Sequence, residues 1–157
     1  MKTALIVIDM QNDYLYEKRK DIFSYKTAEL TAAVNELIHQ YQDNFCDIIY
    51  IRHIIQNLPT NRLLFGYSIA GTEGAELFRG LDIVSDYCFD KLFSDALSNK
   101  KLRELIQKKG YETATALGAA KRGINAKIIS KGTATVFSPK KVAKAHERLN
   151  KSGVEYI

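Results

Sequence analysis

Short apolar runs alternate with longer segments of helical periodicity along this chain. The first run, residues 3–9, is continuously apolar up to Asp9 and too short for a helix, which is typical of a strand buried on both faces of a parallel sheet. Residues 27–41 then carry an apolar stripe at helical spacing, which predicts an amphipathic helix. Because such strand–helix units repeat, we expect an α/β protein: a three-layer α/β/α sandwich around a mostly parallel, Rossmann-like sheet.

The remaining elements follow from the same patterns. We expect further strands at residues 46–54, 83–89, 126–129 and 154–157, and further helices at residues 94–109, 112–122 and 138–150. Residues 56–80 form a long loop with a short helix near residues 75–78. Gly110 ends one helix and Pro139 begins another. The length predicts a single domain over residues 1–157.

Charge and composition argue against several classes of protein. The net charge is +5, but the lysine pairs are spread over several helical faces and alternate with glutamates, so we expect no nucleic-acid partner. No apolar run reaches the roughly 18 residues that would span a bilayer, and Asp9 interrupts the only signal-like segment. We therefore expect a cytoplasmic protein without a membrane partner. Cys46 and Cys88 form no CxxC pair, so we expect two buried cysteines without a disulfide.

Polar residues follow three of the predicted strands. Asp9 ends the first, His53 ends the second, and Lys91 follows the third. Ligands of open parallel sheets bind at the carboxyl ends of strands, where Lys91 and Asp9 would stabilise each other's charge. A turn or cap role for Asp9 and a solvated Lys91 remain alternatives. No second ligand follows His53 at metal-binding spacing, and no glycine-rich phosphate loop follows Asp9, so we expect no metal and no cofactor.

Four segments carry a family resemblance in the same order along the chain. They are Leu5-Ile6-Val7-Ile8-Asp9-Met10-Gln11-Asn12-Asp13-Tyr14, then Gly71-Thr72-Glu73-Gly74-Ala75, then Lys91 with Phe93-Ser94, and finally Thr115-Ala116 with Ala119 and Gly123. Together they resemble the isochorismatase-like cysteine hydrolases over nearly the whole chain. The resemblance implies that Asp9 and Lys91 are catalytic, and that Tyr14, His53 and Phe93 contact a small-molecule substrate. It also implies a homo-oligomer.

The third catalytic residue of that family, a cysteine at the start of a helix, has no counterpart here. Tyr111 stands at its position, and one strand with its turn is missing between residues 110 and 112 relative to the family. Two interpretations follow. The sequence omits a segment of a longer hydrolase that acts on an amide, a carbamoyl compound or an isochorismate-like enol ether. Alternatively, the chain is an inactive member that binds a small ligand or acts as an oligomeric partner. A flavodoxin-like phosphate binder is a third, weaker reading.

Overall fold

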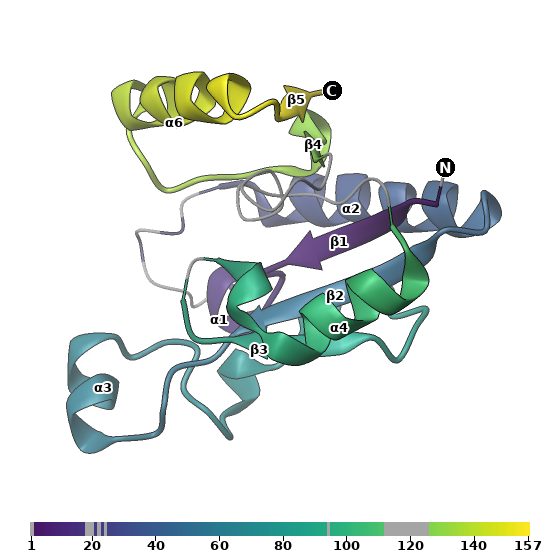
Figure 1. Ribbon diagram of the computed structural model, residues 1–157. Coiled ribbons are helices and arrows are strands. Elements are labelled where there is room, and N and C mark those ends of the chain that lie inside the picture. Colours follow the sequence, from purple (N-terminus) through teal and green to yellow (C-terminus); the bar gives the residue numbers. More distant parts are fainter. Residues whose placement is uncertain (1, 18–20, 22, 24, 94, 112–125) are drawn as a thin grey trace.

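A parallel three-stranded sheet forms the centre of the protein (Figure 1). The computed structural model describes residues 2–17, 21, 23, 25–93, 95–111 and 126–157. The strands β1 (Ala4–Ile8), β2 (Asp47–His53) and β3 (Cys88–Lys91) pair in the order β1-β2-β3. All their pairings are parallel, so the carboxyl ends of the three strands lie at one edge of the sheet.

Helices cover both faces of this sheet. Because successive side chains of a strand point to opposite faces, Leu5 and Val7 pack on helix α2 (Thr27–Asp43), while Ile6 packs on helix α4 (Lys100–Lys109). The two faces thus give two separate apolar cores. The predicted three-layer α/β/α architecture with a mostly parallel sheet is confirmed.

Helix α4 is shorter than the predicted helix over residues 94–109. A 3-10 turn, η2 (Ala96–Ser98), precedes it, and the Asn99 side chain accepts a hydrogen bond from the Leu102 amide at 3.1 Å, so α4 begins after Asn99. At the other end Gly110 takes a left-handed conformation (φ 66°), and its amide donates to the Ile106 carbonyl at 3.0 Å. Gly110 therefore ends the helix as predicted, because a residue without Cβ adopts this conformation freely.

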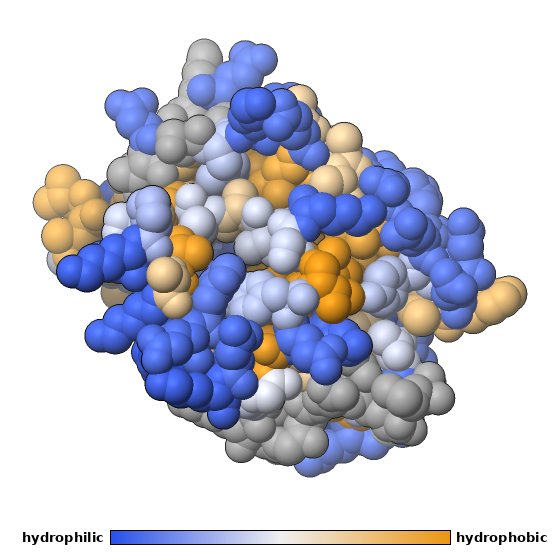
Figure 2. Space-filling model, turned by 90° about the horizontal axis from the view of Figure 1, so that it is seen from above, coloured by the Kyte–Doolittle hydropathy of each residue, from blue (hydrophilic) through white to orange (hydrophobic). Residues whose placement is uncertain are grey.

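The described residues after 125 form a second, smaller sheet. Strands β4 (Lys127–Ile128) and β5 (Glu155–Tyr156) pair in parallel, and helix α6 (Pro139–Lys151) connects them after the 3-10 turn η3 (Ser130–Gly132). Among the described strands, neither β4 nor β5 is hydrogen-bonded to the β1–β3 sheet. Figure 2 views the molecule from the side of α6, where hydrophilic residues make up most of the surface and hydrophobic ones show between them.

Three local predictions need correction or lie outside the structure. The predicted strand over residues 83–89 is instead β3, whose last residue is Lys91. Residues 56–80 contain helix α3 (Pro59–Leu64), which was not predicted, and the short helix near residues 75–78 is the 3-10 turn η1 (Glu73–Ala75). The predicted helix over residues 112–122 lies outside the described residues. Within the described residues, no helix is long and apolar enough to cross a membrane.

Candidate active site

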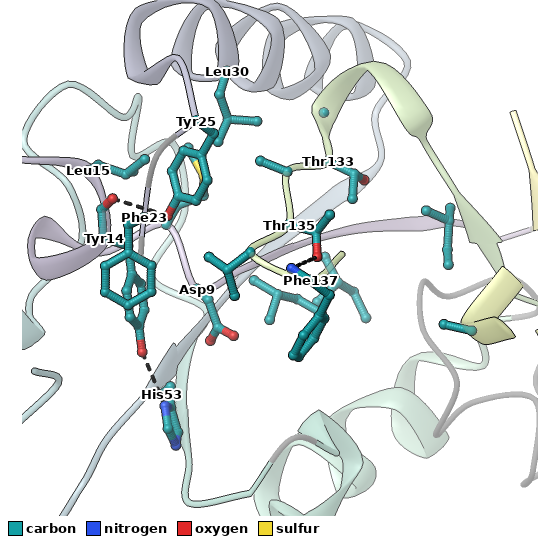
Figure 3. A pocket seen from close by; sticks show the side chains of 18 of the residues that line it. Asp9, Tyr14, Leu15, Phe23, Tyr25, Leu30, His53, Thr133, Thr135 and Phe137 are labelled. Atoms are coloured by element: carbon teal, nitrogen blue, oxygen red, sulfur yellow. Dashed lines mark hydrogen bonds between the residues drawn. The ribbon is translucent and has the colours of Figure 1, made fainter. Parts of the chain in front are cut away.

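Three predicted site residues meet at the carboxyl edge of the sheet. Asp9 directly follows β1, and His53 and Lys91 are the last residues of β2 and β3, where they pair in register. The Asp9 amide donates to the Ile51 carbonyl at 2.9 Å, which fixes the end of β1 against β2. The order of the strands therefore places the His53 backbone between those of Asp9 and Lys91. Figure 3 shows the Asp9 carboxylate and the His53 ring on the same side of a pocket.

Asp9 and Lys91 form an ion pair. The Lys91 ammonium donates to Asp9 Oδ2 at 3.0 Å, and the Lys91 side chain is only 6% exposed, whereas that of Asp9 is 38% exposed. The other carboxylate oxygen, Oδ1, is buried and has no hydrogen-bond partner within the described part of the chain. A buried charge is costly unless it is paired, so Lys91 depends on Asp9 for its counter-charge. As far as the described residues go, the pair therefore leaves one carboxylate oxygen of Asp9 without a partner.

The backbone at Asp9 is strained. Asp9 has a φ of 60°, in the left-handed region that residues with a Cβ seldom adopt, although Asp and Asn tolerate it better than most. The Gln11 amide donates to the Asp9 carbonyl at 2.9 Å and closes the tight turn after β1. Such conformations persist where the surrounding structure enforces them, often at functional sites.

Gln11 enforces this turn, although nothing in the sequence distinguished it from the other residues of its motif. Its side chain is fully buried, and its amide nitrogen donates to the carbonyls of His53 at 3.0 Å and Ala75 at 2.7 Å. Its amide oxygen accepts from the His53 backbone N–H at 2.7 Å. One side chain thus holds the end of β2 and the turn η1 around the segment that follows Asp9.

Tyr14 and His53 belong to a buried hydrogen-bond network. Ser68, which is fully buried, donates its hydroxyl proton to the Tyr14 oxygen at 2.6 Å, and the Tyr14 oxygen lies 3.1 Å from His53 Nδ1. Burial raises the pKa of Tyr14, so its hydroxyl stays protonated at neutral pH. The sequence offered no signal for Ser68, which is contributed by the long loop.

The model of the isochorismatase domain family matches residues 3–157. The chain belongs to the isochorismatase family. Its members are generally hydrolases of small molecules. No curated protein matches the chain.

Solved structures of the isochorismatase family share the fold of this chain at low sequence identity. An isochorismatase-like hydrolase from Alkaliphilus metalliredigens has a TM-score of 0.80 and 18% identity, covering 99% of this chain and 94% of its own. Nicotinamidase from Bacillus subtilis has a TM-score of 0.78 and 18% identity, with coverages of 99% and 98%. N-carbamoylsarcosine amidase from Thermoplasma acidophilum has a TM-score of 0.77 and 16% identity, with coverages of 99% and 95%.

The two cysteines of this isochorismatase-family chain lie away from Asp9. Cys46 directly precedes β2 and Cys88 is the first residue of β3, so both are at the amino ends of strands. The four residues of β3 put Cys88 about 10 Å from Lys91 along the strand. The prediction that both are buried is wrong: Cys46 is half-buried and Cys88 is exposed, because β3 is an edge strand of its sheet. Neighbouring side chains nevertheless remove part of the water around the Cys88 thiol, and this partial desolvation raises its pKa.

A hollow of about 580 Å³ opens beside Asp9 in this isochorismatase-family fold (Figure 3). Asp9, Tyr14 and His53 line it, whereas Phe93, whose side chain is 68% exposed, is not among its lining residues. In Figure 3, Phe137 lies across the pocket from Tyr14, with Asp9 between them. Within the described part of the chain, no three His, Cys, Asp or Glu side chains gather in a way that could hold a metal ion.

Proposed function

We propose that this protein hydrolyses a small amide, carbamoyl compound or isochorismate-like enol ether through Asp9, Lys91 and a cysteine. That cysteine stands in a segment that the 157-residue sequence omits between residues 110 and 112. The observation that carries the proposal is the state of Asp9: Lys91 donates to Oδ2 at 3.0 Å, while the buried Oδ1 has no hydrogen-bond partner among the described residues. A carboxylate oxygen that is buried and unengaged is suited to accept a proton in the reaction.

In the proposed mechanism for an amide, Asp9 removes the proton from the thiol and the thiolate attacks the carbonyl carbon. The carbonyl oxygen takes the electron pair, and its return expels the amine, which receives the proton from Asp9. Asp9 then removes a proton from water as the water attacks the thioester, which releases the acid and restores the thiol. Lys91 stabilises the ionised form of Asp9 between these steps.

Tyr14 and His53 are proposed to contact the substrate. Because Ser68 donates to the Tyr14 oxygen, the Tyr14 hydroxyl is free to donate to His53 Nδ1, in the tautomer that carries its ring proton on Nε2. His53 then offers a single N–H donor, which suits a carbonyl acceptor on the substrate. Phe93 would reach the substrate only by turning in from its exposed position.

A non-catalytic ligand-binding protein is the second candidate. The observation that favours it is the position of Cys46 and Cys88, which lie at the amino ends of strands while Asp9 and Lys91 lie at the carboxyl ends. Such a protein would keep the hollow and bind a small molecule without turnover.

Intact-mass spectrometry of the protein from its natural source tests the proposal. We expect a mass above the 17.8 kDa of these residues by about a dozen residues, the size of one strand and its turn. We also expect a third thiol that iodoacetamide labels faster than Cys46 and Cys88 at neutral pH. A mass of 17.8 kDa without a fast-reacting thiol would refute the hydrolase and leave the binding protein.

A further inference from the structure

Helix α3 forms the tip of an arm that stands away from the sheet (Figure 1). This arm, residues 54–68, leaves the sheet after β2, and two backbone hydrogen bonds close its base. The Ile55 amide donates to the Ser68 carbonyl at 2.7 Å, and the Ala70 amide donates to the Ile55 carbonyl at 2.8 Å. The closed base gives the arm a fixed direction.

The tip of the arm is apolar, and no other described segment buries it. Leu63 and Leu64 are 86% and 73% exposed, and none of the six residues of α3 is buried. Isolated helices shorter than about 12 residues are only marginally stable in water, so most helices depend on packing. An exposed apolar patch on such a helix indicates a surface that another molecule covers.

A second exposed apolar pair lies at the foot of the arm. The Ile54 amide donates to the Lys91 carbonyl at 2.9 Å, so the chain that leaves β3 starts beside the first residue of the arm. Leu92 and Phe93, which follow directly, are 55% and 68% exposed. Because the arm follows β2 and its foot follows β3, this surface is separate from the outer edge of β1, where an omitted strand would pair.

The apolar area that the arm and its foot expose is close to what a stable interface needs. If a fully exposed large apolar residue presents about 180 Å², six residues together expose roughly 650 Å². A standard interface buries about 800 Å² of each partner. The six are Leu58, Leu63, Leu64, Phe65, Leu92 and Phe93.

The charges of the chain favour a second copy of itself as the partner at this surface. The net charge is +5, so two copies repel each other over most of their surfaces. The arm contains a single charged residue, Arg62, whose Nε donates to Asn57 Oδ1 at 2.6 Å. Two copies can therefore meet here with little repulsion, and the arm and the foot supply the two halves of a self-complementary contact.

We propose that two copies of this chain form a twofold dimer in which Leu63 and Leu64 of each arm pack against Leu92 and Phe93 of the other copy. The twofold axis makes this contact twice, so each copy both inserts its tip and receives one. The dimer does not rest on the proposed function, because none of these four side chains lines the hollow beside Asp9.

Sedimentation equilibrium of the protein expressed from its natural gene tests this dimer. At about 10 μM we expect the wild type to have twice the mass of one chain. Leu63→Glu/Leu64→Glu should have the mass of one chain, because carboxylates buried without partners should weaken the dimer at least about a hundredfold.

A matched double variant controls for the added charges. Phe45 and Ile83 are 99% and 52% exposed and precede β2 and β3, whereas the arm and its foot follow these strands. Phe45→Glu/Ile83→Glu should therefore remain dimeric. Circular dichroism confirms that both double variants fold.

A single tryptophan reports the contact between the tip and the foot. The chain contains no tryptophan, so Phe93→Trp introduces one fluorophore. Its emission should move to shorter wavelength as the protein is concentrated and the dimer forms, because the arm of the other copy removes water from the ring. The shift should be absent when Leu63→Glu/Leu64→Glu is added.

The outcomes separate this dimer from the proposed function. A monomeric wild type, an arm variant with the mass of the wild type, or a control variant that dissociates equally would overturn the dimer. A dimer whose tryptophan emission does not move would overturn the contact with Phe93. If the dimer forms as expected but the natural protein hydrolyses none of the proposed substrates, the dimer stands and the hydrolase fails.

Discussion

Replacing Asp9 with asparagine should destabilise the protein through Lys91. The Lys91 side chain is 6% exposed, and its ammonium pairs with Asp9 Oδ2 at 3.0 Å. Removing one member of a fully buried pair costs about 3–5 kcal/mol, but the Asp9 side chain is 38% exposed, so water reaches part of the site. We therefore expect Asp9→Asn to lower the free energy of unfolding by about 2 kcal/mol. Asparagine is the right probe because it tolerates the left-handed backbone at this position.

Urea unfolding followed by circular dichroism measures this loss. With an m-value of about 2 kcal/mol per molar, Asp9→Asn should lower the unfolding midpoint by about 1 M. The double variant Asp9→Asn/Lys91→Met should recover most of the loss, because no unpaired charge remains buried. Lys26→Met, which breaks a pair whose side chains are 77% and 70% exposed, should cost less than about 0.5 kcal/mol.

Additive effects of Asp9→Asn and Lys91→Met would contradict this reasoning. So would an Asp9→Asn variant as stable as the wild type, since either result would mean that Lys91 does not depend on the carboxylate.

Three further predictions concern other groups. Tyr111 donates a hydrogen bond to Asp47 Oδ2 at 2.6 Å, and this bond lowers the pKa of Asp47. The bond therefore stabilises the folded protein at pH values above the ordinary carboxyl pKa, and this contribution is lost as the pH falls through the lowered pKa of Asp47. In urea unfolding, Tyr111→Phe should lower the free energy of unfolding by about 1 kcal/mol relative to the wild type at pH 7 and leave it unchanged near pH 2. An equal loss at both pH values would exclude the bond to ionised Asp47 as the cause. Tyr14→Phe should cost about 2 kcal/mol in the same assay, because the buried Ser68 hydroxyl loses its acceptor, and wild-type stability would refute the network. Iodoacetamide should label Cys88 more slowly than free cysteine at pH 7, because partial desolvation raises the pKa of its thiol; faster labelling would contradict that shift.

The sequence by itself determined the elements whose signal is local. The apolar run ending at Asp9 becomes β1, the apolar stripe within residues 27–41 becomes the buried side of α2, and Gly110 ends α4. Each of these follows from side-chain periodicity or from the backbone freedom of one residue, which neighbours in the chain are sufficient to set. The motifs at Asp9 and Lys91 also located the candidate site.

Only the tertiary structure decided how distant segments meet there. Lys91 contacts Asp9 across 82 positions of sequence, Gln11 holds His53 across 42, and Ser68 reaches Tyr14 across 54. The parallel pairing of β4 with β5 is likewise a contact between distant segments, which no local pattern encodes. Strand order and register arise from packing of the whole chain, because the same apolar run can pair with several partners until the cores on both faces select one.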